Sequence, residues 1–165
     1  MLTIRPAGPG DAVAILNVHR EAILAKAAEH YPAATLEAWG AGATPERVAR
    51  QERQIADPEF LVLVAETGGD TVGFAIAVPS REELRALYVK PNGAGRVGRV
   101  LLAELERRAF RTAKALNCDA SLNAVPFYRA NGYAEKGRAE HILSSGVSVP
   151  CVRMSKARPA AMPNR

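Results

Sequence analysis

Short apolar segments separated by turn residues predict several strands. The segment FLVLVAE at 60–66 is almost continuously apolar, and the turn residues at 68–70 lead into a second apolar segment at 71–78. Pro79-Ser80 then connects to a third predicted strand at 83–89. Three consecutive strands on short connections indicate an antiparallel meander. The remaining predicted strands lie at 2–5, 118–122, 133–137 and 147–155.

Apolar residues at helical spacing predict helices between these strands. A stripe that starts near Val13 and runs to about residue 28 predicts the first helix, and Asp11 stands where it could cap it. Thr44 before Pro45 is a helix start signal, and that helix should end before Asp57-Pro58. Shorter helical pieces are predicted at 36–39 and 126–131, the second one stopped by Gly132.

The longest helical stripe follows a glycine-rich turn at 92–98. Its apolar positions predict one helix that ends near residue 117, and they are Leu101, Leu102, Leu105, Ala109, Ala113 and Leu116. A strand, a helix and a further strand in this order place the strand at 118–122 parallel to the strand at 83–89. We therefore expect the sheet to splay or change direction there.

These elements favour one α+β domain with a mixed, mostly antiparallel sheet flanked by helices. The chain has 165 residues, enough to bury one sizeable core. We expect the domain to span 1–156. Residues 157–165 contain two prolines and no periodicity, so we expect a flexible tail.

Composition disfavours several classes of protein. Hydrophobic residues make up 48% and charged residues 24% of the chain, both ordinary for a globular protein. Without a membrane-length apolar run or a signal-peptide pattern, we expect a cytoplasmic protein with no membrane partner. The net charge is +5, but basic residues are interleaved with glutamates, which disfavours specific nucleic-acid binding. Cys118 and Cys151 lack metal-ligand spacing, so we expect no metal site and two small buried side chains.

The glycine-rich turn itself has the composition of an anion-binding site. Glycines let the backbone curl so that several N–H groups point at one spot, and the following helix adds the positive end of its dipole. Arg96 and Arg99 would add positive charge there. The turn therefore predicts a ligand that carries phosphate.

Two motifs in order resemble the GNAT superfamily of acyl-CoA-dependent N-acetyltransferases. They are LYVKP at 87–91, followed by the glycine turn, and SLNAVPFYRANGY at 121–133. The likeness extends from Met1 to about Lys156, and two motifs on their expected elements are more specific than a lone glycine pattern. The resemblance implies a GNAT-like fold and acetyl-CoA as cosubstrate.

What the family does implies roles for particular residues. The strand ending at Val89 would pair with the pantetheine arm of CoA, and the turn would bind its pyrophosphate through backbone N–H groups. The tyrosine of the second motif, Tyr128, would be the general acid that protonates the departing thiolate. The cofactor-binding positions implied in this way are Leu87, Tyr88, Val89, Gly93, Ala94, Gly95, Arg96, Val97, Gly98, Arg99 and Asn123.

The turn departs from the usual family pattern of Gln/Arg-x-x-Gly-x-Gly/Ala. Compared with a common family version, Ala-Gly-Arg-Gly-Val-Gly-Arg, the turn lacks one glycine between Arg96 and Val97, which implies one N–H fewer in the phosphate cradle. A lost hydrogen bond to a charged group costs about 1.5 to 3 kcal/mol, so CoA would bind about tenfold more weakly or worse. The alternative function is therefore a catalytically weak or inactive acyl-CoA-binding module.

The reaction needs a base, because an ammonium must lose its proton before it attacks a thioester. Glu83 is the first candidate, since several GNAT enzymes carry a catalytic glutamate or histidine at this place on the strand. A surface glutamate is an equally good interpretation, and Arg85 could pair with it. Strict alternation would place Glu83, Arg85, Leu87 and Val89 on one face of the strand. Glu82 and Glu66 are weaker candidates, and a strand N–H near Tyr88 or Val89 would hold the oxyanion.

The acceptor is the least determined part of the function. In this fold the first two helices and their connection build the acceptor pocket, which here contains His19, Glu21, His30, Tyr31, Leu36 and Trp39. These residues suit a small-molecule or peptide amine, although Tyr31 and Trp39 could equally well pack the helices against the sheet. His141 could approach the site from the last hairpin. GNAT proteins are often dimers, so a homodimer through that hairpin is a further expectation.

Overall fold

Within residues 1–160, which the computed structural model describes, the strands form one sheet in the order β1-β2-β3-β4-β5-β7-β6. The strands are β1 (Leu2–Pro6), β2 (Leu61–Thr67), β3 (Asp70–Val78), β4 (Glu83–Val89), β5 (Ala115–Ser121), β6 (Ala134–Ile142) and β7 (Ser148–Ala157). The helices are α1 (Ala12–Lys26), α2 (Ala33–Trp39), α3 (Pro45–Ala56), α4 (Ala94–Ala109) and α5 (Val125–Ala130). The predicted α+β class and the meander β2-β3-β4 are confirmed. None of the helices in these residues is long and apolar enough to cross a membrane.

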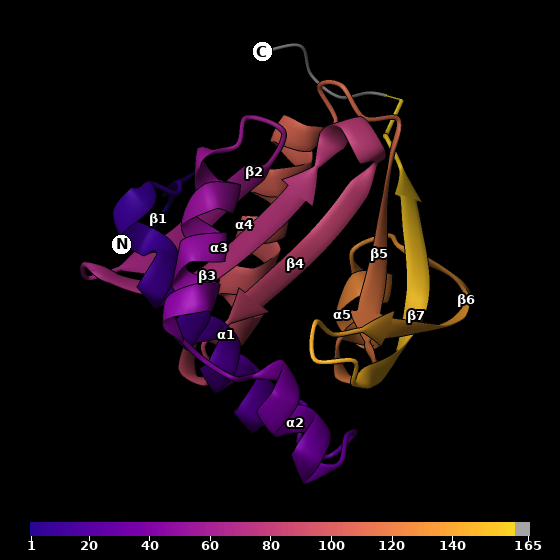
Figure 1. The fold of residues 1–165 in the computed structure, drawn as a ribbon. Coiled ribbons are helices and arrows are strands. Elements are labelled where there is room, and N and C mark those ends of the chain that lie inside the picture. The colour runs from indigo at the N-terminus through magenta and orange to yellow at the C-terminus, as the bar shows by residue number, and fades with distance from the viewer. Residues whose placement is uncertain (161–165) are drawn as a thin grey trace.

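The sheet divides between β4 and β5. All other neighbouring strands pair antiparallel, whereas β4 and β5 are parallel and share a single register pair, Glu83 with Asn117. Figure 1 shows the two strands close together at the top of the view and separated towards the bottom. The predicted splay is therefore present, and it opens a gap in the middle of the sheet.

Glu82 joins the two halves at the closed end of this gap. Its carbonyl oxygen accepts hydrogen bonds from the backbone N–H of Asn117 at 2.8 Å and from the Asn117 side chain at 3.0 Å. Its carboxylate accepts a third bond, from the backbone N–H of Lys114 at 3.1 Å. Glu82 adopts a left-handed backbone conformation with φ of 53°, which is uncommon for a residue with a side chain. These three bonds hold that conformation in place.

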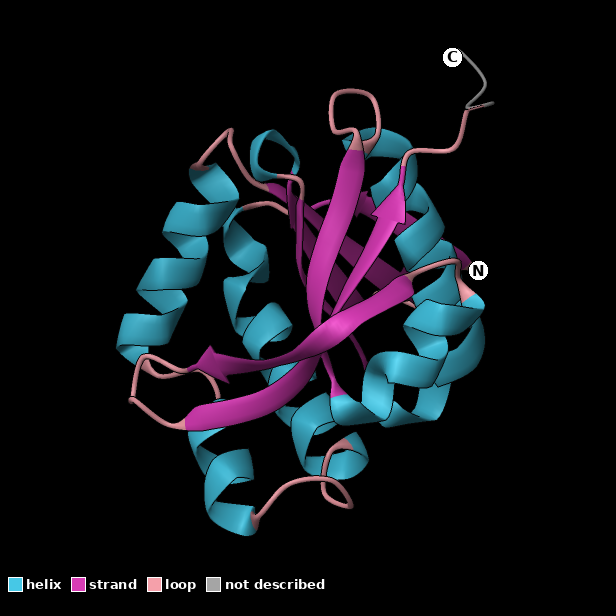
Figure 2. Ribbon diagram, turned by 90° about the vertical axis from the view of Figure 1, so that its right-hand side faces the viewer, coloured by secondary structure: helices cyan, strands magenta, loops and turns pink. Residues whose placement is uncertain are grey.

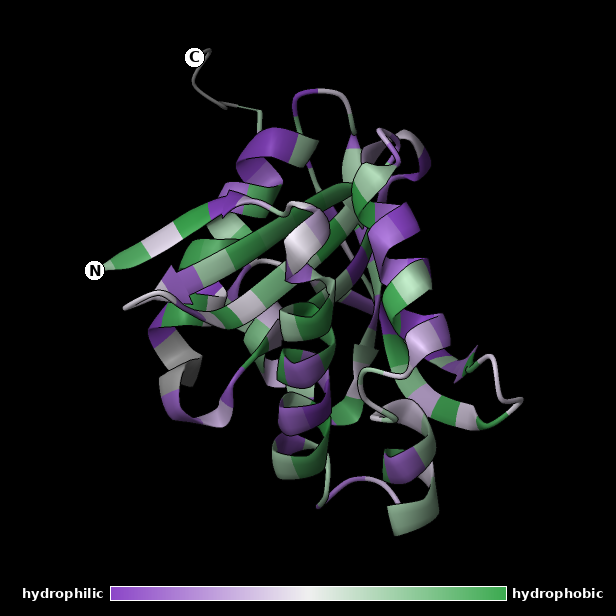
Figure 3. Ribbon diagram, turned by 60° about the vertical axis from the view of Figure 1, so that its left-hand side comes forward, coloured by the Kyte–Doolittle hydropathy of each residue, from purple (hydrophilic) through white to green (hydrophobic). Residues whose placement is uncertain are grey.

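Helices cover both faces of the sheet, as the view along it shows (Figure 2). On one face α4 packs with its leucines against β2, β3 and β4, around Leu63, Ala75 and Leu101. On the other face α1 packs through Ile15 and Val18 against the same strands. The central strands are correspondingly hydrophobic and the helices present their polar residues outward (Figure 3). Apolar burial on both faces fixes the strands of the first half.

A β-bulge in β4 contradicts the predicted alternation of that strand. Ile76 of β3 stands opposite Ala86 and the next residue, Ala77, stands opposite Leu84, so Arg85 is the extra residue. Leu84 therefore joins Leu87 and Val89 in the core beneath α4, whereas Ala86 and Tyr88 face the side of α1. The prediction of one face for residues 83, 85, 87 and 89 was wrong, because one inserted residue exchanges the faces.

Helix α4 is shorter than its apolar stripe predicted. It ends at Ala109, and β5 already begins at Ala115. Ala113 keeps the helical spacing because its N–H donates to the Ala109 carbonyl in one isolated turn after the helix. Leu116 is buried as well, but it belongs to β5. Spacing alone cannot separate a helix end from a buried strand start.

Tyr31 connects the N-terminal helices to the second half of the sheet. The Tyr31 hydroxyl donates to the Pro150 carbonyl at 2.5 Å and accepts from the Leu122 N–H at 3.0 Å.

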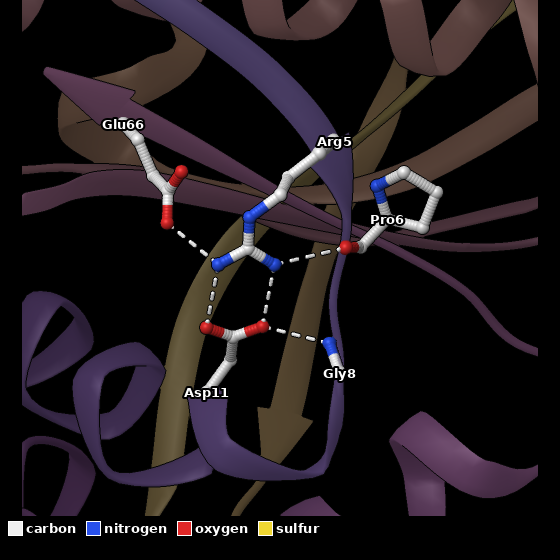
Figure 4. Close-up of polar contacts among 5 residues, drawn as sticks. All are labelled: Arg5, Pro6, Gly8, Asp11 and Glu66. Atoms are coloured by element: carbon white, nitrogen blue, oxygen red, sulfur yellow. Dashed lines mark hydrogen bonds and ion pairs between the residues drawn. The ribbon is translucent and has the colours of Figure 1, made fainter. Parts of the chain in front are cut away.

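The prediction that Asp11 caps α1 is wrong, because its side chain makes no capping hydrogen bond to that helix. Instead it binds Arg5 through both oxygens and accepts from the Gly8 N–H, with Glu66 on the same guanidinium (Figure 4). The predicted start of α3 at Thr44-Pro45 is confirmed, and the Thr44 side chain caps the helix by accepting from the Arg47 N–H.

Candidate active site

The first component of the site is the open edge of β4. The Lys90 N–H donates to the Val72 carbonyl on β3 at 2.8 Å. Since main-chain groups alternate in direction along a strand, those of Leu87 and Val89 face the gap towards β5, and those of Tyr88 face β3. The Val89 carbonyl accepts a bond from Lys26 Nζ at 3.3 Å. Leu87 and Val89 thus offer backbone groups to an extended ligand in the gap.

The second component is the start of α4, at the open end of the gap. Only residues 90–93 separate β4 from this helix, which begins at Ala94. A helix leaves its first four N–H groups without intrahelical partners, and here they belong to residues 93–96. Gly98 lies inside the helix, where a Cβ atom would come within 3.3 Å of the Phe127 ring. The helix start narrows the backbone donors of the predicted cradle to residues 93–96, with Arg96 and Arg99 exposed beside them.

The third component comes from the segment after β5. Because β4 and β5 are parallel, this segment and the start of α4 lie at the same end of the sheet. Asn123 has a buried Oδ1 atom without a hydrogen-bond partner among the described residues. Tyr128 on α5 is buried, and its hydroxyl makes no hydrogen bond to another described residue. Among the described residues, two polar groups of this segment therefore have unused hydrogen-bonding capacity.

The environment of Tyr128 keeps its hydroxyl protonated. Burial raises the pKa of Tyr128 well above its ordinary value, and the nearby Cys118 and Tyr88 raise it further. These two neighbours belong to β5 and β4, so the hydroxyl lies between the diverging strands. The Tyr128 ring is held edge-on between Phe127 and Tyr133.

A cavity of about 820 Å³ lies on the α1 side of the same gap. Ile15, His19, Trp39, Phe74 and Tyr88 supply its apolar and aromatic surface. The remaining walls include residues of α3, the bulged part of β4, β5, β7 and the end of β6 with the loop that follows it. The gap thus has a backbone-lined side near α4 and a side-chain-lined cavity opposite.

Only part of the predicted acceptor pocket lines this cavity. The cavity is lined by His19, Trp39 and His141, and also by Glu83, the first candidate for the base. Tyr31 and Leu36 are buried in packing contacts with Trp39 and Val149, whereas Glu21 and His30 are exposed on the surface. The packing interpretation therefore holds for Tyr31, because its hydroxyl is occupied by two backbone groups.

Glu83 is bound by the neighbouring Arg85. Arg85 donates through Nε to one carboxylate oxygen at 2.9 Å and through Nη2 to the other at 3.2 Å. Both side chains remain partly exposed to the cavity. Of the weaker candidates, Glu82 joins the sheet halves as described above, and Glu66 pairs with Arg5 at 2.6 Å.

Comparisons with known proteins agree with this geometry. A family model described as "Acetyltransferase (GNAT) domain" matches residues 27–156. The chain belongs to the GNAT acetyltransferase family. A search of curated sequences finds no significant match.

Solved structures with the same fold include three N-acetyltransferases. A GCN5-related N-acetyltransferase from Rhodopseudomonas palustris is 31% identical with a TM-score of 0.83, covering 94% of each chain. A ribosomal-protein-alanine N-acetyltransferase from Brucella melitensis is 27% identical with a TM-score of 0.69, covering 94% of this chain and 99% of the other. PaiA N-acetyltransferase from Thermoplasma acidophilum, solved in complex with coenzyme A, is 21% identical with a TM-score of 0.69, covering 95% and 99%.

The two cysteines of this GNAT domain stay in the protonated thiol form, which is a poor nucleophile. Burial raises the pKa of Cys118 to about 12, with smaller contributions from Asp119 and Cys151. Burial also raises the pKa of Cys151. At neutral pH the thiolate is the reactive form, so neither side chain is suited to carry an acyl group.

The α3 side of the GNAT cavity contains residues that the sequence analysis did not identify. Arg47, Arg50, Gln51 and Gln54 all line it. Their spacing of three, four and seven residues puts them on one helix face. A polar stripe of this kind was the available signal, but most positions of the helix are polar and the stripe does not stand out.

His19 is an electrically neutral part of the aromatic wall. Its ring lies 4.6 Å from that of Tyr88 and 6.4 Å from those of Trp39 and Phe74. Burial, with a smaller contribution from the positive charge of Arg47, lowers the pKa of His19 from 6.5 to about 4. The folded protein therefore resists protonation of this ring.

This depressed pKa predicts a loss of stability in mild acid. Between pH 6.5 and about 4 the unfolded chain binds a proton at His19 that the folded protein does not, so folding stability falls as the pH is lowered through this window. The difference amounts to at most about 3 kcal/mol. His19→Gln should flatten the pH dependence of urea unfolding in this range, and His30→Gln at an exposed position should not. Equal slopes in wild type and His19→Gln would contradict the assignment.

Proposed function

We propose that the protein transfers an acetyl group from acetyl-CoA to an amine of a small molecule or peptide. The main support is the gap between β4 and β5, with the main-chain groups of Leu87 and the N–H of Val89 facing it on one side and the protonated Tyr128 hydroxyl on the other. In this proposal residues 1–156 form the catalytic domain.

The residues around the gap fit acetyl-CoA. Its phosphates suit the backbone N–H groups of residues 93–96 and the positive end of the α4 dipole. Its amide-bearing arm suits the strand edge at Leu87 and Val89. The buried Asn123 Oδ1, which has no hydrogen-bond partner within residues 1–160, can accept a hydrogen bond from an amide N–H. The relative PaiA, solved with coenzyme A, gives further support.

Three groups of the chain would carry the reaction, for which acetyl-CoA supplies the activated thioester. Glu83 accepts the proton of the amine, directly or through water, so that the nitrogen can attack. The Val89 N–H faces the gap and stabilises the developing oxyanion, a role for which Tyr88 is oriented the wrong way. Tyr128, protonated at neutral pH, donates its proton to the departing sulfur.

The irregular glycine turn, which lacks one N–H of the usual phosphate cradle, favours a second candidate, an acyl-CoA-binding module without catalysis. Calorimetric titration with acetyl-CoA, followed by thiol release in the presence of a panel of amines, separates the two. We expect binding, and thiol release that depends on the amine. Binding without release on any amine would support the module, and no binding would contradict both functions.

The tyrosines at 128 and 133 provide a matched test of the general acid. Tyr128→Phe should lower turnover about tenfold or more with little change in CoA binding or stability, because its hydroxyl has no partner in the described structure to lose. Tyr133 donates to Glu106 at 3.0 Å, so Tyr133→Phe should cost about 1–3 kcal/mol of stability and leave turnover unchanged. Steady-state kinetics and urea unfolding measure both effects. Unchanged turnover in Tyr128→Phe would remove it from the mechanism.

Glu83→Gln tests the base while keeping the size of the side chain. Turnover should fall about a hundredfold at neutral pH, because an amide cannot take the proton. Glu52→Gln, at an exposed position on α3, controls for the loss of one negative charge. If Glu83→Gln keeps its activity, the base lies elsewhere, and His141 on the cavity wall is the next side chain to replace.

A further inference from the structure

The charges around the acceptor cavity do not balance. Among the described residues, its lining includes five arginines and three carboxylates. Each carboxylate is already engaged: Glu82 with the Lys114 backbone, Glu83 with Arg85, and Asp119 with Arg153 at 3.2 Å. The cavity therefore has an excess of positive charge.

This excess is located on one face of α3. Arg81 pairs with Glu59 at 3.4 Å. Neither Arg47 nor Arg50 has a carboxylate within salt-bridge distance in the part of the chain that the structure describes. The two arginines are three residues apart on the helix, so they repel one another unless an anion lies between them or nearby.

Arg47 is held in place. Its Nη1 donates to the Gly42 carbonyl at 2.8 Å, and the side chain is partly buried. Partial burial and the charge of Arg50 lower the pKa of Arg47, which reflects the cost of this environment to the cation. A guanidinium has five donors in a planar fork that matches carboxylate and phosphate oxygens. A fixed, partly desolvated guanidinium without a counter-ion is suited to bind an anion.

We propose that Arg47 and Arg50 bind an anionic group of the acceptor, which is therefore an amine that also carries a carboxylate or a phosphate. This inference rests on the proposed function, because it assigns the cavity to the acceptor. Glu83 on β4, although paired with Arg85, lines the same cavity and in the proposed reaction takes the proton of the acceptor's amine, and α3 supplies the cations for the opposite charge. The aromatic wall with Trp39 and Tyr88 accommodates the apolar part of the molecule between them.

Matched pairs of amines test the proposal and distinguish the two anions. L-glutamine and L-phenylalanine are compared with their α-carboxamides, and phosphoethanolamine is compared with ethanolamine. For at least one pair, we expect kcat/KM to be about tenfold higher or more for the anionic member, because its KM is lower. The pair that shows the preference identifies carboxylate or phosphate. Equal kcat/KM within every pair would overturn the proposal.

The Arg47→Gln/Arg50→Gln variant assigns the preference to these residues. Its KM for the anionic amine should rise at least tenfold, whereas its KM for the uncharged partner and its affinity for acetyl-CoA should not change. Arg53→Gln, on the same helix but outside the cavity lining, should behave as wild type. A preference that survives in the double variant would overturn the assignment.

Calorimetric titration tests the anion site without turnover, so that its failure can be told apart from failure of the proposed function. If acetyl-CoA binds but no amine is acetylated, the proposed function fails. Titration with phosphoethanolamine and with L-glutamine then tests the anion site alone. Binding by wild type and Arg53→Gln but not by the double variant supports the anion site, and equal titration of all three proteins contradicts it.

Discussion

The separation of β4 from β5 is the constraint on which the rest of the structure depends. Two parallel neighbours would ordinarily exchange hydrogen bonds along their whole length, and the backbone groups of β4 would then be satisfied within the sheet. Here the bonds around Glu82 hold the strands together at one end only. Beyond that point the edge of β4 is free, which is costly unless a ligand or water completes it.

The two halves stay together because other contacts cross the molecule. Tyr31 links the helical layer of the first half to β7 and to the turn after β5. Tyr128 and Leu116 of the second half pack into the same core as α4 and β3. The gap is therefore part of the packed fold, and its walls can orient two substrates towards each other.

The two sides of the gap differ in chemistry. Towards α4 the available groups are mostly backbone N–H and C=O, whose positions depend on chain direction and helix start rather than on side-chain identity. Towards α1 and α3 the cavity is lined by side chains, including an aromatic wall and a row of arginines and glutamines. This division suits a cosubstrate shared across a family on one side and an acceptor particular to this protein on the other.

The amino-acid sequence was enough to predict the order of the elements, the fold class, the turn before α4 and the motif around Tyr128, because these depend on local patterns of a few residues. It did not determine the end of α4 or the faces of β4, since a last isolated turn and a single bulged residue leave no local signal. The pairing of Glu83 with Arg85 was already an alternative in the sequence, because the two residues are neighbours on one strand. Only the tertiary structure brought Arg47 and Arg50 to the same cavity as Glu83, with no carboxylate of the described residues within salt-bridge distance of either arginine. The reason is physical: the balance of charge in a cavity depends on which distant segments line it, and that is decided by packing.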